Sequence, residues 1–229
     1  MENIPFVNIH THNELSNAIG LRSLSPEEGM PPGTPGTLFS AGIHPWEAGR
    51  CRDLHEARQK LRRLLVMPGV VAVGETGIDL SPAWRHTHQE QTALFRVHLE
   101  EAAAAGMPLI IHCVKAFEQV LALLLEYRPH GAVFHGFIGS QIQAQAAAKA
   151  GFFLSFGARS LRSPRTVGAL RSLPADAIFA ETDDGAESIE HIYDSMSYAT
   201  GISIAELKEK LYNNISRLLP ETERRDNTK

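Results

Sequence analysis

Short apolar segments alternate with helical segments along most of this chain, and this alternation constrains its fold more than any other feature. Val70–Val73 and Pro108–Ile111 are continuous apolar runs, as expected of parallel strands buried on both faces. Between them, Gln89–Ala105 has the length of a helix and is followed by Gly106, a residue that commonly ends helices. Seven strands are recognisable, and Ala18–Leu24 is a candidate for an eighth. The pattern predicts an α/β fold: a TIM-type (β/α) barrel of 7–8 parallel strands, compact or slightly distorted.

An open, doubly wound sheet is the alternative arrangement of alternating strands and helices. Sheets of this kind that bind dinucleotides carry a Gly-rich fingerprint, and the segment Gly74–Gly77 has the wrong spacing for one. The length of 229 residues, with 43% of them hydrophobic, suits one globular domain. We therefore predict a single barrel domain over residues 1–220, followed by a polar C-terminal tail over residues 221–229.

The composition argues against a strongly basic surface and against a disulfide framework. The formal net charge is −4 and the pI is about 6.3, so local arginines or bound cations would have to attract a polyanionic substrate. The 2 cysteines are too few for a disulfide framework, which favours a reducing compartment. Residues 1–5 lack the features of a signal peptide, and no apolar run has membrane-spanning length. These observations predict a soluble, cytoplasmic protein with no membrane partner.

Side chains that can bind metal stand at nearly every predicted strand end, which is where barrel enzymes carry their chemistry. Imidazole and carboxylate groups together suit Zn²⁺, Mn²⁺ and similar divalent ions. A carboxylate can bridge two such ions, which can then share a hydroxide and clamp a phosphodiester. The strand-end residues are His10, His12, His44, Glu75, His112, His135 and Asp183.

Single members of this set also have structural interpretations. An isolated histidine pair is more often hydrogen-bonded packing than a metal site, and His44 could equally be structural. Asp183 competes with Asp184 and Glu181, because any of the three could cap a helix. The recurrence of such residues at successive strand ends is what favours a metal site.

Six motifs containing these residues, in this order, resemble the TatD family of metal-dependent hydrolases, whose members are described as deoxyribonucleases or phosphodiesterases. The resemblance implies an amidohydrolase-like barrel with two divalent metal ions (Zn, Mg or Mn). It also implies that Glu75 bridges the ions, that His10, His12 and Asp183 complete the first ligand set, and that His112 and His135 hold the second ion. The motifs are Ile9–His12, Gly42–Pro45, Val73–Asp79, Pro108–His112, His135–Ser140 and Glu181–Asp183.

Three segments depart from the family pattern. The family usually has Asp where this chain has Asn8, Ser-Arg-Asp where it has Cys113–Lys115, and Ala-Pro where it has Asp184–Gly185. The ligand set is intact while the surrounding residues differ. The resemblance to the family therefore predicts metal-dependent hydrolysis more firmly than it predicts the exact substrate.

Arginines are concentrated in Gly157–Arg165, which follows the predicted strand Phe152–Phe156 and therefore lies on the face of the strand ends. In an acidic protein these arginines could grip phosphate, although a solvated loop is the alternative. The predicted substrate-binding residues are His44, Arg159 and Arg162.

The predicted function is that of a metal-dependent hydrolase, a deoxyribonuclease or phosphodiesterase in which a metal-bound hydroxide attacks DNA or another phosphodiester. Glu75 and Asp183 are the predicted catalytic residues, with Asp183 orienting or deprotonating the water. Hydrolysis of another phosphoester, a lactone or an amide is one alternative. A role as an interaction subunit of a larger assembly is the other, and the sequence does not identify a protein partner.

Overall fold

The computed structural model describes residues 4–15, 17–26 and 37–219. The predicted tail over residues 221–229 and most of the Pro- and Gly-rich segment that ends at Gly36 lie outside these residues. The described residues form two compact units: unit 1 holds residues 4–22 and 134–219, and unit 2 holds residues 23–133. The expectation of a single domain over residues 1–220 stays a prediction.

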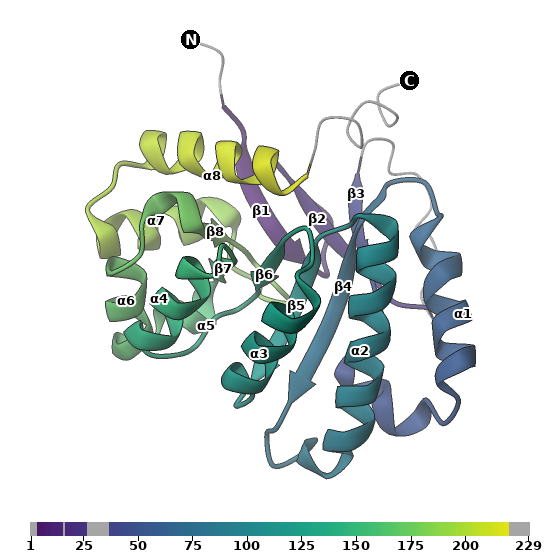
Figure 1. Ribbon diagram of the computed structural model, residues 1–229. Coiled ribbons are helices and arrows are strands. Elements are labelled where there is room, and N and C mark those ends of the chain that lie inside the picture. The colour runs from purple at the N-terminus through teal and green to yellow at the C-terminus, as the bar shows by residue number, and fades with distance from the viewer. Residues whose placement is uncertain (1–3, 16, 27–36, 220–229) are drawn as a thin grey trace. The chain divides into compact units, whose positions relative to one another are not determined.

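Unit 1 contains the first and the last strands of the chain. β1 (Phe6–Thr11) pairs in parallel with β2 (Ala18–Leu24), which begins in this unit, and β7 (Phe153–Phe156) pairs in parallel with β8 (Ile178–Ala180). The helices of unit 1 are α4 (Gln141–Lys149), α5 (Ala158–Leu161), α6 (Pro164–Arg171), η3 (Ala175–Ala177), α7 (Ile189–Thr200) and α8 (Ile204–Leu218) (Figure 1).

The first strand lies beside the last one, and this contact identifies the type of sheet. β8 contacts β1, and a parallel bridge joins Thr11 to Asp183 just beyond the strand ends. A doubly wound sheet instead reverses its strand order at a central strand, so its first and last strands do not meet. Adjacent first and last strands are what the closure of a barrel requires. The described residues contain eight strands, and the predicted α/β barrel class is confirmed.

Unit 2 contains three parallel strands from the middle of the chain. β3 (Leu38–Ala41), β4 (Val70–Asp79) and β5 (Leu109–Val114) pair in parallel in this order. Figure 1 shows α1 and α2 side by side next to β4. None of the helices within the described ranges combines the length and apolar character needed to cross a membrane. The remaining elements are η1 (Pro45–Arg50), α1 (Leu54–Leu65), η2 (Arg85–Thr87), α2 (His88–Ala105), α3 (Phe117–Tyr127) and β6 (Ala132–Phe134), which ends at the edge of the unit.

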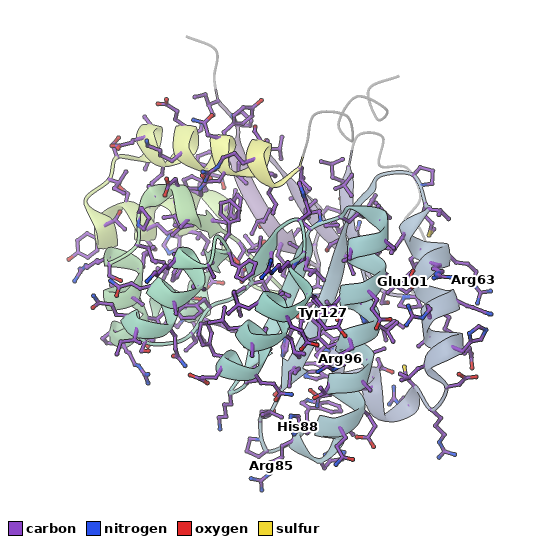
Figure 2. All side chains as sticks on the ribbon, viewed as in Figure 1. Arg63, Arg85, His88, Arg96, Glu101 and Tyr127 are labelled. Atoms are coloured by element: carbon purple, nitrogen blue, oxygen red, sulfur yellow. The ribbon has the colours of Figure 1, made fainter. Side chains whose placement is uncertain are left out.

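Contacts of α2 fix the segment that follows β3. Glu101 of α2 points towards α1 (Figure 2), where its carboxylate accepts hydrogen bonds from Arg58 and Arg62. His98, on the same helix, is fully buried, and burial lowers the pKa of its imidazole to about 4. The neutral ring accepts a hydrogen bond from the backbone N–H of Ile43 at Nε2. The residue next in the chain is His44, so α2 helps to place one of the predicted site residues.

β4 is longer than the sequence predicts. The apolar run ends at Val73, but the strand continues through two glycines to Asp79. Gly74 and Gly77 have φ angles of +149° and +143°, which side chains other than glycine rarely adopt. A Cβ atom at Gly77 would lie 2.0 Å from the carbonyl oxygen of His112 on β5. The glycines therefore let β4 approach β5 closely on both sides of Glu75.

The segment Gly157–Arg165, for which a solvated loop is the alternative to a phosphate grip, is largely helical. It contains the whole of α5 and the start of α6. Ser163 caps α6 by accepting a hydrogen bond from the backbone N–H of Thr166, and Pro164 occupies the first turn, where its missing N–H costs nothing. Arg159 therefore projects from α5 and Arg165 from α6, and Arg162 lies in the turn between the two helices.

Candidate functional site

In unit 1 the structure brings together His10, His12, His135 and Asp183. His10 and His12 lie at the end of β1, His135 follows β6, and Asp183 follows β8. The Nε2 atoms of His10 and His12 each lie 3.6 Å from Oδ1 of Asp183, and the ring centroids of His10 and His135 are 4.3 Å apart. The possible ligand atoms of His10, His135 and Asp183 all lie within 4.8 Å of one another. This spacing is compatible with one shared cation.

The backbone holds Asp183 in place between strands β1 and β8. Its N–H donates to the carbonyl of His10, and its own carbonyl accepts from the N–H of His12, both at 3.1 Å. The hydroxyl of Thr11 donates to the same carbonyl at 3.2 Å. The φ angle of Asp183 is +54°, a left-handed conformation that Asp and Asn tolerate better than most residues. These contacts aim the carboxylate at the two histidines.

Asn8, where the family usually has Asp, uses both atoms of its amide. Its Oδ1 accepts from the backbone N–H of Thr182 at 3.1 Å, and its Nδ2 donates to the hydroxyl of Thr182 at 2.8 Å. That hydroxyl donates in turn to the hydroxyl of Thr11 at 3.0 Å. An Asp could accept at both places but could not donate. Through these two hydrogen bonds Asn8 fixes the position of Thr182, the residue that precedes Asp183.

Glu181 is a buried carboxylate that the sequence raised only as a competitor of Asp183. It is 1% exposed, and its Oε1 lies 3.7 Å from Nδ1 of His135. The hydroxyl of Ser155 donates to its Oε2 at 2.5 Å. From this position Glu181 can orient the ring of His135. The sequence does not predict this role, because His135 and Ser155 are far from Glu181 along the chain.

In unit 2 the structure brings together His44, Glu75 and His112. β4 shifts its register against β5 between Val73 and Thr76, and Glu75, which is 5% exposed, lies in this shifted segment. Its Oε1 lies 3.1 Å from Nε2 of His44 and 2.8 Å from Nδ1 of His112. The possible ligand atoms of the three residues lie within 4.8 Å of one another. His44, predicted to bind substrate, thus also lies within metal-ligand distance.

Asp79 is a site residue that the sequence analysis missed, although it ends the family motif. Its Oδ2 accepts from the indole N–H of Trp46 at 2.8 Å and lies 3.1 Å from Nε2 of His112. Burial alone raises the pKa of the Asp79 carboxyl, but hydrogen bonds from His112, Trp46 and Ser81 outweigh it and hold the pKa well below its usual value. Asp79 is therefore a carboxylate at neutral pH.

These donor sets fit divalent cations. Both ring nitrogens of His112 face carboxylate oxygens, one of Glu75 and one of Asp79. An ionised carboxylate can only accept, so each nitrogen must either carry a proton or share a cation with the neighbouring oxygen. Imidazole and carboxylate at such distances are the ligands that zinc and manganese favour. Each unit therefore contains a group of residues able to hold a metal ion.

The two predicted substrate arginines are exposed and paired with acids. Arg159 donates to both carboxylate oxygens of Asp184 at 2.8 and 2.9 Å, and lies 3.6 Å from Asp183. Arg162 donates to Glu187 at 2.9 Å. Arg159 thus borders the histidine cluster of unit 1. The predicted bridging of two ions by Glu75 and the predicted pairing of His112 with His135 join residues of different units, and both stay predictions.

Known proteins resemble this chain in sequence over most of its length. The profile of the family described as TatD related DNase matches residues 33–220. A protein named 3'-5' ssDNA/RNA exonuclease TatD from Enterobacter lignolyticus is 35% identical over 150 residues, which cover 63% of this chain and 56% of the relative. The chain thus matches little more than half the length of such exonucleases. The metal-dependent hydrolase YcfH of Escherichia coli K12 is 30% identical over 200 residues, 79% of this chain and 73% of the relative.

Solved structures agree on the fold. The YJJV protein of Escherichia coli, a TatD homologue, superimposes with a TM-score of 0.78 and 19% identity, covering 93% of this chain and 97% of that one. A TatD family hydrolase of Entamoeba histolytica superimposes with a TM-score of 0.76 and 16% identity, covering 94% and 98%. With the matching profile and the similarity to YcfH, these findings lead to one conclusion: this chain belongs to the family of TatD-related DNases.

Proposed function

We propose that this protein is a metal-dependent hydrolase of phosphodiester bonds and that its substrate is single-stranded nucleic acid. The observation that carries the proposal is the grouping of histidines and carboxylates, His10, His135 and Asp183 in one unit and His44, Glu75 and His112 in the other. The printed name of the exonuclease relatives supports a single-stranded substrate. Membership of the family supports the hydrolytic reaction.

Two divalent ions, Zn, Mg or Mn, would complete this site. His10, His12, Glu75 and Asp183 would hold one ion, and His112 and His135, with Glu75 as the bridge, would hold the other. A bound divalent ion supplies Lewis-acid stabilisation of negative charge and lowers the pKa of a water molecule. The groups within each unit, whose possible ligand atoms lie within 4.8 Å of one another, support metal binding at these residues, and the division of the ligands between two ions follows the resemblance to the TatD family.

Other residues of the chain would position the attacking water and the metal ligands. Asp183, aimed by its backbone contacts, would orient the attacking water and accept its proton. Asp79 would hold the ring of His112 and raise its basicity, as outer carboxylates commonly do for ligand histidines. Asn8 and Thr182 would keep the backbone of Asp183 in register.

The metal dependence can be tested directly. Protein treated with a chelator should lose hydrolysis of single-stranded oligonucleotides, and Mg²⁺, Mn²⁺ or Zn²⁺ should restore it. Elemental analysis of the purified protein identifies the ions. Model monoesters, lactones and amides serve as competing substrate classes. Preferred turnover of one of these classes, or full oligonucleotide hydrolysis after chelation, would contradict the proposal.

The phosphate grip of Arg159 and Arg162 stays part of the proposal. Both side chains are exposed, and exposed ion pairs contribute only about 0–1 kcal/mol, so substrate phosphates could replace Asp184 and Glu187 at little cost. Arg159→Ala and Arg162→Ala should raise KM several-fold and weaken its salt dependence. An unchanged slope of log KM against log salt concentration in both variants would exclude the grip.

The cytoplasmic location predicted from the sequence also stays a proposal. Its support is the low cysteine content together with the lack of a membrane-spanning helix in the described part of the chain. Cell fractionation would test it, and recovery of the protein outside the cytoplasmic fraction would contradict it.

A further inference from the structure

The chain's 2 tryptophans stack on each other beside the carboxylate–histidine cluster of unit 2. Their ring centroids are 5.2 Å apart and their planes differ by 11°. Trp46 contacts the rings of His44 and His112 edge to face, with centroids 4.5 and 6.0 Å away. Trp46 is nevertheless 44% exposed. A large aromatic surface is thus presented to solvent next to possible metal ligands.

Hydrogen bonds hold the ring of Trp46 and the backbone of Trp84 in place. The indole N–H of Trp46 donates to Asp79. The backbone carbonyl of Trp84 accepts from Nε2 of Gln91 at 2.8 Å, and Gln91 is fully buried. The same Gln91 accepts from the backbone N–H of Asp79 at 2.7 Å. One buried glutamine therefore couples the loop that carries Trp84 to the backbone of Asp79, whose carboxylate accepts the hydrogen bond from Trp46.

A purely structural role accounts poorly for this arrangement. A ring whose task is to fill space is normally buried, because burial of apolar surface is what stabilises the fold. Orientation of Asp79 would require only a hydrogen-bond donor and no second stacked tryptophan. A rigid, solvent-facing stack matches the platforms on which proteins bind unpaired bases, since every base has a π-face and stacking costs little entropy when the rings are already fixed.

We propose that Trp46, backed by Trp84, is a stacking platform for a nucleobase that flanks the phosphodiester bound at His44, Glu75 and His112. This inference rests on the proposed function. The base must leave its own stack to reach the ring, so the platform favours single strands over duplex and tolerates any base. Arg85, the residue after Trp84, is exposed and projects outward from the turn before α2 (Figure 2), where it can meet a neighbouring phosphate.

Intrinsic fluorescence tests the platform directly because the two tryptophans are the chain's whole complement. The intact protein is titrated in the presence of divalent metal ions, and phosphorothioate linkages in the probes keep the strand from being consumed. The probes are a short oligothymidylate and an abasic strand of equal length and charge. The oligothymidylate should quench the fluorescence, and the abasic strand should bind about 10-fold more weakly, with little quenching.

Two variants separate stacking from the hydrogen bond to Asp79. Trp46→Phe keeps an aromatic ring and loses the donor, whereas Trp46→Gln keeps a donor and loses the ring. We expect Trp46→Gln to weaken oligothymidylate binding about 10-fold and Trp46→Phe to change it less than about threefold. Tyr198→Ala, which removes an aromatic residue of α7 that is 91% exposed, is the control and should bind like wild type.

The outcomes distinguish this inference from the proposed function. Equal binding of both probes without quenching, or a larger effect of Trp46→Phe than of Trp46→Gln, would overturn the platform, and metal-dependent hydrolysis by the wild type would still support the proposed function. Base-dependent quenching without hydrolysis under any metal would overturn the proposed function and support the platform as a nucleic-acid-binding surface.

Discussion

The variant Glu75→Ala is expected to lower kcat/KM for single-stranded DNA by on the order of 10³-fold and to reduce the metal content of the purified protein. The carboxylate is buried and lies within 3.1 Å of His44 and 2.8 Å of His112, so its removal leaves two imidazoles without the anion between them. Glu75→Gln should be almost as impaired, because it keeps the volume and loses the charge. Steady-state kinetics and elemental analysis measure both effects.

The matched control is Glu126→Ala. Glu126 is an exposed glutamate of α3 in the same unit, paired with Arg96 at the surface. It should retain wild-type activity and metal content, because exposed ion pairs contribute little. Circular dichroism would verify that the Glu75 variants remain folded. Full activity of Glu75→Ala in metal-depleted protein would refute a role for this residue in the centre.

Asp183→Asn should reduce kcat by about 10²- to 10³-fold while leaving the fold intact. Asparagine tolerates the +54° φ angle of this position, so the backbone hydrogen bonds to His10 and His12 can persist. Only the negative charge beside the two imidazoles is lost. Asp183→Ala would mix this effect with backbone strain and is the less informative variant.

Asp184→Asn is the control for Asp183→Asn, since it removes a charge one residue further along the chain. Asp184 pairs with the exposed Arg159, and its loss should change kcat less than about threefold. Circular dichroism of both variants separates a folding defect from a loss of catalysis. Equal kinetics of the two Asn variants would contradict the role assigned to Asp183.

The fold class was largely predictable because its signals are local. Continuous apolar runs such as Pro108–Ile111 predict buried parallel strands whatever their neighbours are. Details that depend on neighbouring strands were harder to predict. Considered alone, Gly74 and Gly77 predict the end of a strand, yet they extend β4 because β5 approaches closely at Ile110 and His112.

The candidate site also contains residues that the sequence predicts and residues that it does not. His10, His112 and Asp183 could be identified because each follows an apolar strand, and the ends of parallel strands point to one face. Asp79 and Trp46 were missed. They are 33 positions apart, and nothing in either local segment announces the hydrogen bond between them. Neither the stacking of Trp46 on Trp84 nor the link through Gln91 leaves a local pattern in the sequence.

The sequence by itself determined the barrel class and indicated which chain positions are candidates to bind metal, because strand periodicity and the residue at a strand end are properties of single segments. Only the tertiary structure decided which of these residues lie close together and which carboxylates face His112. It also explains why an asparagine, which can both donate and accept hydrogen bonds, suits position 8. Asn8 clamps Thr182, 174 positions away, through a donor and an acceptor whose partners depend on how β1 lies against the end of β8. Such contacts depend on the register between strands that are distant in the sequence. Local sequence patterns do not specify that register, so these contacts could not be predicted from the sequence.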